Sequence, residues 1–232
     1  SPLTEPQQRA FSEILSEDSA HRPVLLHGVT GSGKTEIYMH LIQQCIDEGR
    51  QVLYLLPEIA LTVQIMQRLR RVFGSKLGIF HSRYSDAERV ELWQKQMSSE
   101  PYDVILGARS AVFLPFSRLG LIIIDEEHET SFKQQDPAPR YHARSLAMMT
   151  ARHFPDVRIV MGTATPSIES YHNAVTGKYR LVQLSERYKG MQLPKIDIVN
   201  IADLQRRKMM YGPFSPMLVD ALREAVSNGK QA

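Results

Sequence analysis

The sequence feature that most restricts the fold is the segment 28–35, which reads G-V-T-G-S-G-K-T. It matches G-x-x-x-x-G-K-[ST], where glycines let backbone N–H groups close around phosphate oxygens, the lysine approaches the β- and γ-phosphates and the hydroxyl binds Mg²⁺. An apolar run precedes the segment and a helix-forming stretch follows it, which argues against a structural turn with an incidental lysine. The predicted phosphate and Mg²⁺ ligands are Gly28, Thr30, Gly31, Ser32, Gly33, Lys34 and Thr35.

A second segment, 121–128 (L-I-I-I-D-E-E-H), places acids after four apolar residues. The apolar run predicts a buried strand, and ligands bind at the carboxyl ends of strands in open α/β sheets. We predict that Asp125 holds Mg²⁺ with Thr35 and that Glu126 polarises the attacking water. On its own the segment is equally compatible with a strand that ends in a solvated acidic turn. Together with the phosphate-binding loop it predicts hydrolysis of a nucleoside triphosphate.

Short apolar runs rich in Val, Ile and Leu alternate with longer amphipathic stretches along the chain. Such runs suit strands that are buried on both faces of a parallel sheet, and the alternation implies right-handed crossovers. We therefore predict a three-layer α/β domain with a mainly parallel central sheet. The expected strands are residues 24–26, 52–56, 77–80, 104–106, 121–124, 159–161 and 179–182.

The helices between these strands have recognisable ends and faces. Ser85 and Glu88 form a capping box at the start of one helix. We expect Arg68, Arg70 and Arg71 to form the solvated face of another helix, without a role. Cys45 is expected to be a small packed residue.

The character of the chain changes near residue 184. We predict an ATP-binding domain over residues 1–184 and a connector over 185–214, which contains a Leu-Pro break and a basic run. Ser215 and Pro216 then begin an apolar helix with little domain of its own to pack against. We expect residues 215–232 to be the first helix of a truncated second lobe.

Composition excludes several classes of protein. No apolar run approaches the roughly 18 residues of a membrane span, and we expect a cytoplasmic protein without a membrane partner. The single cysteine excludes an internal disulfide and a cysteine-based zinc cluster within this chain. The net charge of +3 permits nucleic-acid binding without demonstrating it.

Further segments resemble the superfamily 2 helicases. D-E-E-H at 125–128 resembles their DExH box, and G-T-A-T-P-S at 162–167 is similar to their motif III. L-P-E-I-A-L-T at 56–62 and G-A-R-S-A-V-F at 107–113 resemble motifs Ia and Ib of the bacterial primosomal replication-restart helicases, which more often have Thr where Ala108 stands. S-F-K-Q-Q at 131–135 and R-Y-H-A-R at 140–144 are specific to that family, and the resemblance runs in order from residue 3 to residue 231.

This resemblance implies the RecA-like P-loop lobe of an ATP-dependent 3′→5′ DNA helicase that acts at stalled or abandoned forks and restarts replication through primosome assembly. It implies ATP and Mg²⁺ as cofactors and forked or single-stranded DNA as a ligand. Single-stranded DNA-binding protein and other primosome proteins are the implied partners. The implied catalytic residues are Lys34, Asp125, Glu126 and His128.

The family's second lobe carries arginine fingers and a zinc module, neither of which we expect within this chain. We therefore expect a fragment that binds nucleotide weakly and is largely inactive in unwinding.

The same resemblance indicates residues that contact DNA or couple it to the nucleotide. Aromatic side chains stack on bases and cations hold phosphates, so segment 132–144 is a candidate for contact with DNA. The alternative is an ordinary loop whose aromatic side chains lie in the core. The hydroxyls of two threonines in 162–167 are expected to form hydrogen bonds with His128 or Asp125. Alternatively, this segment is a turn that caps the next helix. The predicted residues are Arg109, Phe132, Lys133, Arg140, Tyr141, His142, Arg144, Thr163 and Thr165.

Two of the assignments have plain alternatives. Gln7 lies where a residue that pairs with adenine is expected, or is a solvated helix residue. Arg109 holds a DNA phosphate, or is a surface arginine without a role.

Two other functions remain open from the sequence. Another superfamily 2 motor, such as an RNA helicase or a restriction translocase, would differ in which nucleic acid stimulates it. A catalytically silent binding module has no need of Lys34, Thr35, Asp125 and Glu126 together, and their presence argues against it.

Overall fold

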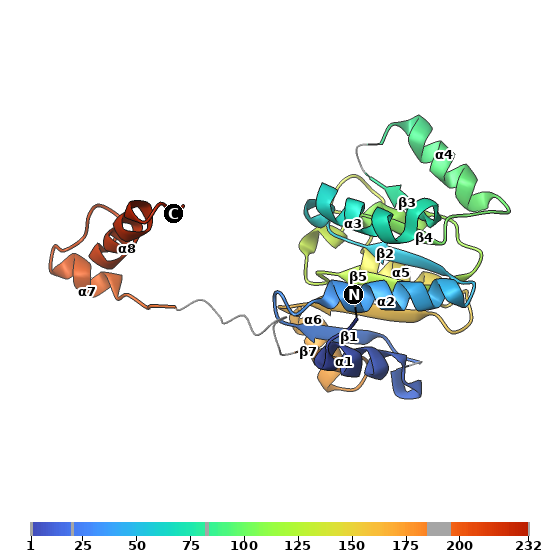
Figure 1. Ribbon diagram of the computed structural model, residues 1–232, viewed down its shortest axis with the longest axis horizontal. Coiled ribbons are helices and arrows are strands. Elements are labelled where there is room, and N and C mark those ends of the chain that lie inside the picture. The colour runs from blue at the N-terminus through green and yellow to red at the C-terminus, as the bar shows by residue number, and fades with distance from the viewer. Residues whose placement is uncertain (1, 20, 82–83, 185–195, 232) are drawn as a thin grey trace. The chain divides into compact units, whose positions relative to one another are not determined.

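The computed structural model describes residues 2–19, 21–81, 84–184 and 196–231. It comprises two units, Ser1–Met191 and Gln192–Ala232. The first is built on a seven-stranded sheet in which every strand pairing is parallel, with the order β3-β4-β2-β5-β6-β1-β7 (Figure 1). All seven predicted strands are present, and the predicted fold class is confirmed. The strands are β1 (Val24–Gly28), β2 (Gln51–Leu55), β3 (Leu77–Phe80), β4 (Val104–Gly107), β5 (Leu119–Asp125), β6 (Arg158–Thr163) and β7 (Arg180–Leu184).

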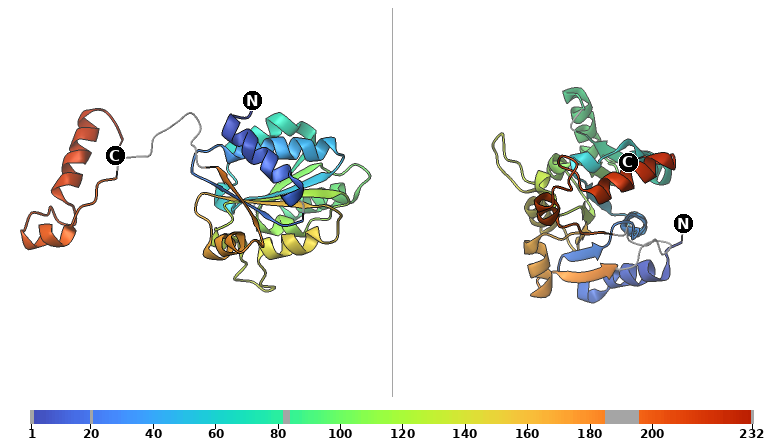
Figure 2. Two further views of the ribbon diagram at one scale, coloured as in Figure 1. Left: turned by 90° about the horizontal axis from the view of Figure 1, so that it is seen from below. Right: turned by 90° about the vertical axis from the view of Figure 1, so that its left-hand side faces the viewer.

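Helices cover both faces of the sheet, because strand residues pack alternately into two hydrophobic cores. In β5, for example, Ile123 belongs to one core and Ile122 and Ile124 to the other. Figure 2 shows α1, α2 and α3 on one face and α5 and α6 on the opposite face. The helices are α1 (Glu5–Leu15), α2 (Lys34–Asp47), α3 (Val63–Phe73), α4 (Asp86–Met97), α5 (Ala143–Ala151) and α6 (Ile168–Val175).

The sheet brings the sequence motifs to one edge, because the carboxyl ends of parallel strands point the same way. The phosphate-binding loop follows β1, and the acids follow β5. Strand β6 lies between them, with Gly162 paired to Asp125 and Thr163 paired to His27. Segments 56–62 and 107–113 lie at the ends of β2 and β4, on the far side of β5.

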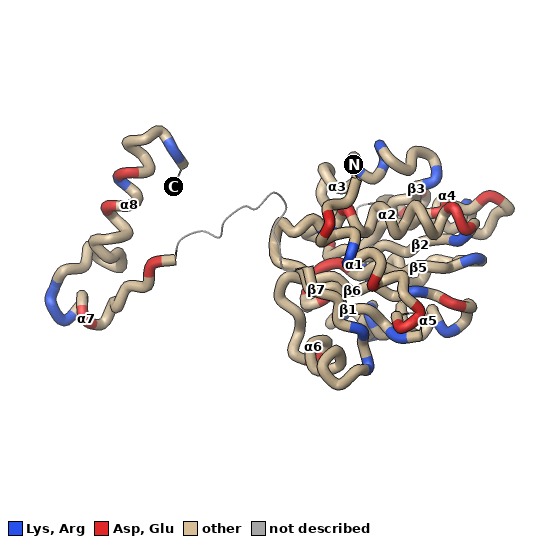
Figure 3. Tube along the Cα trace, turned by 60° about the horizontal axis from the view of Figure 1, so that its bottom comes forward, with Lys and Arg blue, Asp and Glu red and all other residues tan. Residues whose placement is uncertain are grey.

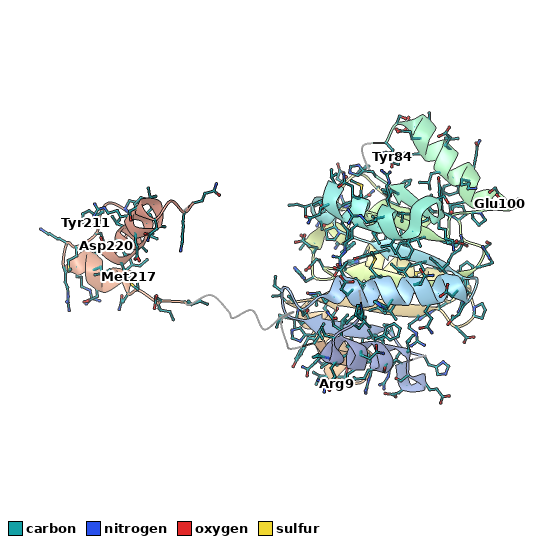
Figure 4. The ribbon with its side chains drawn as sticks, viewed as in Figure 1. Arg9, Tyr84, Glu100, Tyr211, Met217 and Asp220 are labelled. Atoms are coloured by element: carbon teal, nitrogen blue, oxygen red, sulfur yellow. The ribbon has the colours of Figure 1, made fainter. Side chains whose placement is uncertain are left out.

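The expected capping box at α4 is present: Ser85 N–H donates to Glu88 Oε2 (2.8 Å) and Glu88 N–H donates to Ser85 Oγ (3.3 Å). Tyr84 and Glu100, which flank this helix, are labelled in Figure 4. Cys45 is buried, as expected. Among the described residues, no helix is both long and apolar enough to cross a membrane.

The second unit contains two helices, α7 (Ile201–Arg206) and α8 (Pro216–Ser227). Ser215 caps α8 by accepting from Leu218 N–H (3.2 Å), which confirms this helix start. Figure 3 shows the basic run as a blue stretch after α7, and Figure 4 labels Tyr211, Met217 and Asp220 in this unit. Of the expected connector, residues 185–195 lie outside the described residues.

Candidate nucleotide-binding site

The phosphate-binding loop is a closed turn between β1 and α2. Gly31 and Gly33 have φ angles of 77° and 82°, which L side chains rarely adopt. A Cβ atom on Gly33 would also lie 2.3 Å from Gln7 Nε2. Lys34 begins α2, and its Nζ donates to the Gly28 carbonyl (2.9 Å). The loop is therefore shaped by its glycines and closed by its lysine.

The residues of this loop fit a polyphosphate. The hydroxyl of Ser32 is buried and has no hydrogen-bond partner among the described residues, and a phosphate oxygen is an acceptor for it. The N-terminus of α2 presents backbone N–H groups and the positive end of the helix dipole. Thr35, one residue into the helix, lines the cavity and would offer its hydroxyl oxygen to a bound Mg²⁺ ion.

Asp125 ends β5 as a buried carboxylate held by two tyrosines. Tyr38 Oη from α2 donates to its Oδ1 (3.0 Å), and Tyr54 Oη from β2 donates to its Oδ2 (3.4 Å). Burial raises the pKa of Asp125 to about 6, aided by the charge of Glu126 and opposed by that of Lys34. Burial also raises the pKa of both tyrosines well above their usual value, so both act as neutral donors.

Neither Tyr38 nor Tyr54 is among the residues that the sequence motifs mark as functional. The available signal was a polar hydroxyl at positions that the apolar pattern marks as buried, where a tyrosine needs a partner. Gly162 makes room for this arrangement, since a Cβ there would lie 1.6 Å from Tyr38 Oη.

Glu126 and His128 follow Asp125 along the rim of the site. Glu126 has a φ of 52°, an uncommon conformation for a residue other than glycine. His128 Nδ1 lies 2.7 Å from Thr163 Oγ1 and 3.7 Å from Glu126 Oε2. The Thr163 hydroxyl also accepts from Thr165 N–H (3.0 Å). The expected bond between Thr163 and His128 is thus present, whereas neither threonine bonds Asp125 in the described contacts.

Glu127 is a third residue of the site, after Tyr38 and Tyr54, that was not among the predicted functional residues. Its side chain is fully buried and accepts from Arg144 Nη1 (2.9 Å), Ser167 N–H (2.8 Å) and Ser170 Oγ (2.8 Å). Arg144 Nη2 pairs in addition with Glu169 (2.9 Å). These bonds join the acidic segment after β5 to the start of α6. Ser167 caps α6, so the turn after β6 caps the next helix, as one of the two expectations for segment 162–167 had it.

The guanidinium of Arg144 is therefore committed to internal ion pairs. Of the two predicted roles, contact with DNA or coupling, this geometry favours coupling for Arg144, because it bridges the acidic segment and α6.

The predicted contact of Phe132 with DNA requires a correction. Its ring is 1% exposed and belongs to the core on the α5 face, so stacking on a base is excluded in this conformation. The alternative prediction, an aromatic side chain packed in the core, is the one that the structure confirms for Phe132. Tyr141 is partly exposed and packs edge-on against Phe113, with ring centroids 4.8 Å apart.

Lys133 and His142 form a β-bridge that closes the loop before α5, and Figure 2 shows this yellow-green loop standing away from the body of the unit. Lys133 and Arg140 are exposed on it. Burial, followed by the charge of Arg144, lowers the pKa of His142, which caps α5 by accepting from Arg144 N–H. Arg109 ties this loop to β4 by donating to the carbonyls of Ser131 (3.0 Å) and Lys133 (3.2 Å).

Gln7 is 1% exposed, so the solvated-helix alternative is wrong. Its Oε1 accepts from Thr4 N–H (2.9 Å) and its Nε2 donates to the Ser32 carbonyl (3.2 Å). The carboxamide thus braces the phosphate-binding loop from α1.

A cavity of about 620 Å³ joins the two halves of the site. Arg68 of α3 is in its wall and pairs with Glu36 of α2, which corrects the expectation that Arg68 is only a solvated helix residue. Thr165, one of the residues predicted to couple DNA to the nucleotide, lines the cavity, whereas the residues predicted to contact DNA are not in its lining. The cavity is lined by Thr30, Gly31, Gly33, Lys34, Thr35, Glu36, Arg68, Asp125, Glu126, His128, Ala164 and Thr165.

Comparison with known proteins agrees with this geometry. Residues 4–174 match the model of the DEAD/DEAH box helicase family. The chain is 41% identical to the replication restart protein PriA of Bacillus subtilis, 44% to that of Rickettsia conorii and 40% to that of Haemophilus influenzae. These alignments cover 99% to 100% of the chain but 28% to 34% of the relatives. The chain thus spans about a third of their length.

Solved structures share the fold at lower sequence identity. The chain matches RecG bound to a three-way DNA junction with a TM-score of 0.65 and 22% identity, covering 99% of this chain and 28% of that one. It matches the Hef helicase domain of Pyrococcus furiosus with a TM-score of 0.60 and 19% identity, covering 96% and 47%.

Proposed function

Because the chain belongs to the DEAD/DEAH box helicase family, we propose that it is the ATP-binding lobe of an ATP-dependent 3′→5′ DNA helicase that restarts abandoned replication forks. The observation that carries the proposal is the cavity in which the phosphate-binding loop, the acids Asp125 and Glu126 and Thr165 after β6 meet. The relatives named replication restart protein PriA support the link to replication.

The roles of the residues follow from their positions. Lys34 would neutralise the β- and γ-phosphates, and Thr35 and Asp125 would hold Mg²⁺. Glu126 would orient and deprotonate water, because it follows Asp125 directly and its side chain in the cavity wall is 38% exposed. When bound, Mg²⁺–ATP supplies the phosphoanhydride whose cleavage drives the motor.

His128 and Thr163 would transmit the nucleotide state. Their 2.7 Å contact joins the acidic segment to β6, and Thr165 in the same turn lines the cavity. Glu127 and Arg144 extend the connection to α6 and α5. A change at the nucleotide therefore has a hydrogen-bonded route to the loop that carries Lys133 and Arg140.

The proposed ligand of that loop is forked or single-stranded DNA, with single-stranded DNA-binding protein and other primosome proteins as partners of the whole helicase. The exposed cations Lys133 and Arg140 support a phosphate contact. For the domains, we propose the ATP-binding lobe at 1–184, the connector at 185–214 and the first helix of the second lobe at 215–232. The largely exposed apolar side chains of α8 support this last assignment.

The test is binding of a fluorescent ADP with Mg²⁺ to the 232-residue chain. We expect Lys34→Ala to abolish binding and Lys178→Ala, an exposed lysine on the turn before β7, to leave it unchanged. Retained binding in Lys34→Ala would overturn the assignment of the loop. For the whole helicase, stimulation of ATP hydrolysis by RNA alone would favour the RNA-helicase alternative.

A further inference from the structure

Arg68 lies in the middle of α3, next to the fully buried Leu69, and its side chain lines the cavity. Its guanidinium pairs with Glu36, which belongs to the first turn of α2, two residues after Lys34. The Arg68 side chain is 42% exposed and that of Glu36 is 24% exposed. The pair thus joins two helices across the mouth of the proposed nucleotide site.

The strand order fixes the side from which Arg68 approaches. Helix α1, with Gln7, packs on the β7 side of the phosphate-binding loop. Helix α3 follows β2, and β5 with Asp125 lies between β2 and β1 in the sheet. Arg68 therefore reaches the cavity from the side of the Mg²⁺-binding acid, where the terminal phosphate of a nucleotide held by the loop would lie.

The charges in the cavity wall make this position chemically specific. Among the described lining residues, Lys34 and Arg68 carry the positive charges, against the acids Glu36, Asp125 and Glu126. A planar guanidinium binds phosphate oxygens in a two-pronged manner that a carboxylate can imitate. Glu36 is such a carboxylate.

Building on the proposed function, we propose that Arg68 is a phosphate-sensing arginine supplied by this lobe itself. It pairs with Glu36 when the terminal phosphate is absent and contacts the terminal phosphate of ATP when it is present. Helix α3 begins at Val63, directly after segment 56–62 at the edge of the sheet, and Thr62 caps it. The exchange of partners by Arg68 therefore links the ATP or ADP state to that segment.

The experiment measures the affinity of the 232-residue chain for ADP and for a non-hydrolysable ATP analogue, by competition with fluorescent ADP. We expect Arg68→Ala to weaken binding of the ATP analogue about tenfold, the loss of one charge-assisted contact, and to change ADP affinity less than about twofold. Arg71→Ala, an exposed arginine of the same helix, is the matched control and should change neither.

Glu36→Gln separates sensing from a structural ion pair. A structural pair requires both variants to act alike, whereas sensing requires Glu36→Gln to raise the preference for the ATP analogue over ADP. That gain must disappear in Glu36→Gln combined with Arg68→Ala. Thermal unfolding of each variant shows whether it is folded, and Arg68→Lys, which keeps the charge without the fork, should lie between wild type and Arg68→Ala.

An unchanged ratio of the two affinities in Arg68→Ala, or an equal loss of both, would overturn this inference and leave the proposed function intact. Failure of the wild-type chain to bind either nucleotide would overturn both.

Discussion

The hydroxyl of Tyr38 donates a 3.0 Å hydrogen bond to Oδ1 of Asp125. This bond joins the helix that follows the phosphate-binding loop to the strand that carries the proposed Mg²⁺ ligand. Tyr54 approaches the other carboxylate oxygen, and the two rings meet edge to face with centroids 5.6 Å apart. The carboxylate is thus oriented by side chains that the sequence motifs do not include.

Tyr38→Phe removes a donor from a buried carboxylate. We expect it to destabilise the chain by about 1–3 kcal/mol, the cost of leaving such a group unsatisfied, and to weaken Mg²⁺-dependent nucleotide binding. Urea unfolding at pH 8 measures the first effect, and Tyr171→Phe, a partly exposed tyrosine of α6, is the control. In an Asp125→Asn background the destabilisation should shrink. A loss that stays the same in that background would show that the ring, and not the bond to Asp125, matters.

Asp125→Asn should stabilise the nucleotide-free chain in a pH-dependent manner. The pKa of Asp125 is raised from its usual value to about 6, so folding favours the protonated form. The resulting stability is fully present below about pH 4 and is lost as the pH rises through 6. At pH 8 the variant should therefore be more stable than wild type by up to about 3 kcal/mol, with little difference below about pH 4. Urea unfolding without Mg²⁺ across this range tests it, and a difference independent of pH would contradict the raised pKa.

Glu127→Gln leaves the guanidinium of Arg144 without its buried partner. Breaking a buried pair from one side costs about 3–5 kcal/mol, so a large loss of stability is expected. Glu169→Gln is the matched control, because the Glu169 side chain is 79% exposed and its pair with Arg144 should contribute less than about 1 kcal/mol. Chemical unfolding measures the free energy of unfolding of both variants. Equal losses of stability would show that the buried position of Glu127 adds nothing to its ion pair with Arg144.

Gly33→Ala should distort the phosphate-binding loop. The residue has a φ of 82°, and the new Cβ would lie 2.3 Å from Gln7 Nε2. We expect loss of nucleotide binding and a stability loss above the 1–2 kcal/mol that the backbone conformation alone costs. Gly49→Ala has a similar φ of 72° and open space around it, so it isolates the backbone cost. Adding Gln7→Ala to Gly33→Ala should recover part of the stability, and no recovery would mean that the clash with Gln7 is not the cause.

The sequence was sufficient for the sheet and for the core of the site, for a physical reason. Strands buried on both faces, such as β5, must be apolar at consecutive positions, and a phosphate-binding loop must combine glycines with a lysine at fixed spacing. These signals are local. They were sufficient to predict all seven strands and to predict that the phosphate-binding loop lies near Asp125.

The remaining assignments depended on which way a side chain points, and that is set by distant segments. Arg68 lies on the polar face of α3, but α2 brings Glu36 to that face. Phe132 and Arg144 are in a loop whose composition suits DNA, yet one ring enters the core and the guanidinium meets Glu127. Residues of these types have the same local pattern whether they face solvent or the interior.

The position of β6 has a mechanical consequence. Strand β6 is hydrogen-bonded along its length to β1 on one side and to β5 on the other. The phosphate-binding loop and the acids therefore follow strands that belong to one continuous, hydrogen-bonded part of the sheet. A covalent tether between neighbouring strands would leave the working cycle untouched. A tether between α2 and α3, at the Glu36–Arg68 pair, would instead join two helices that no strand pairing holds together.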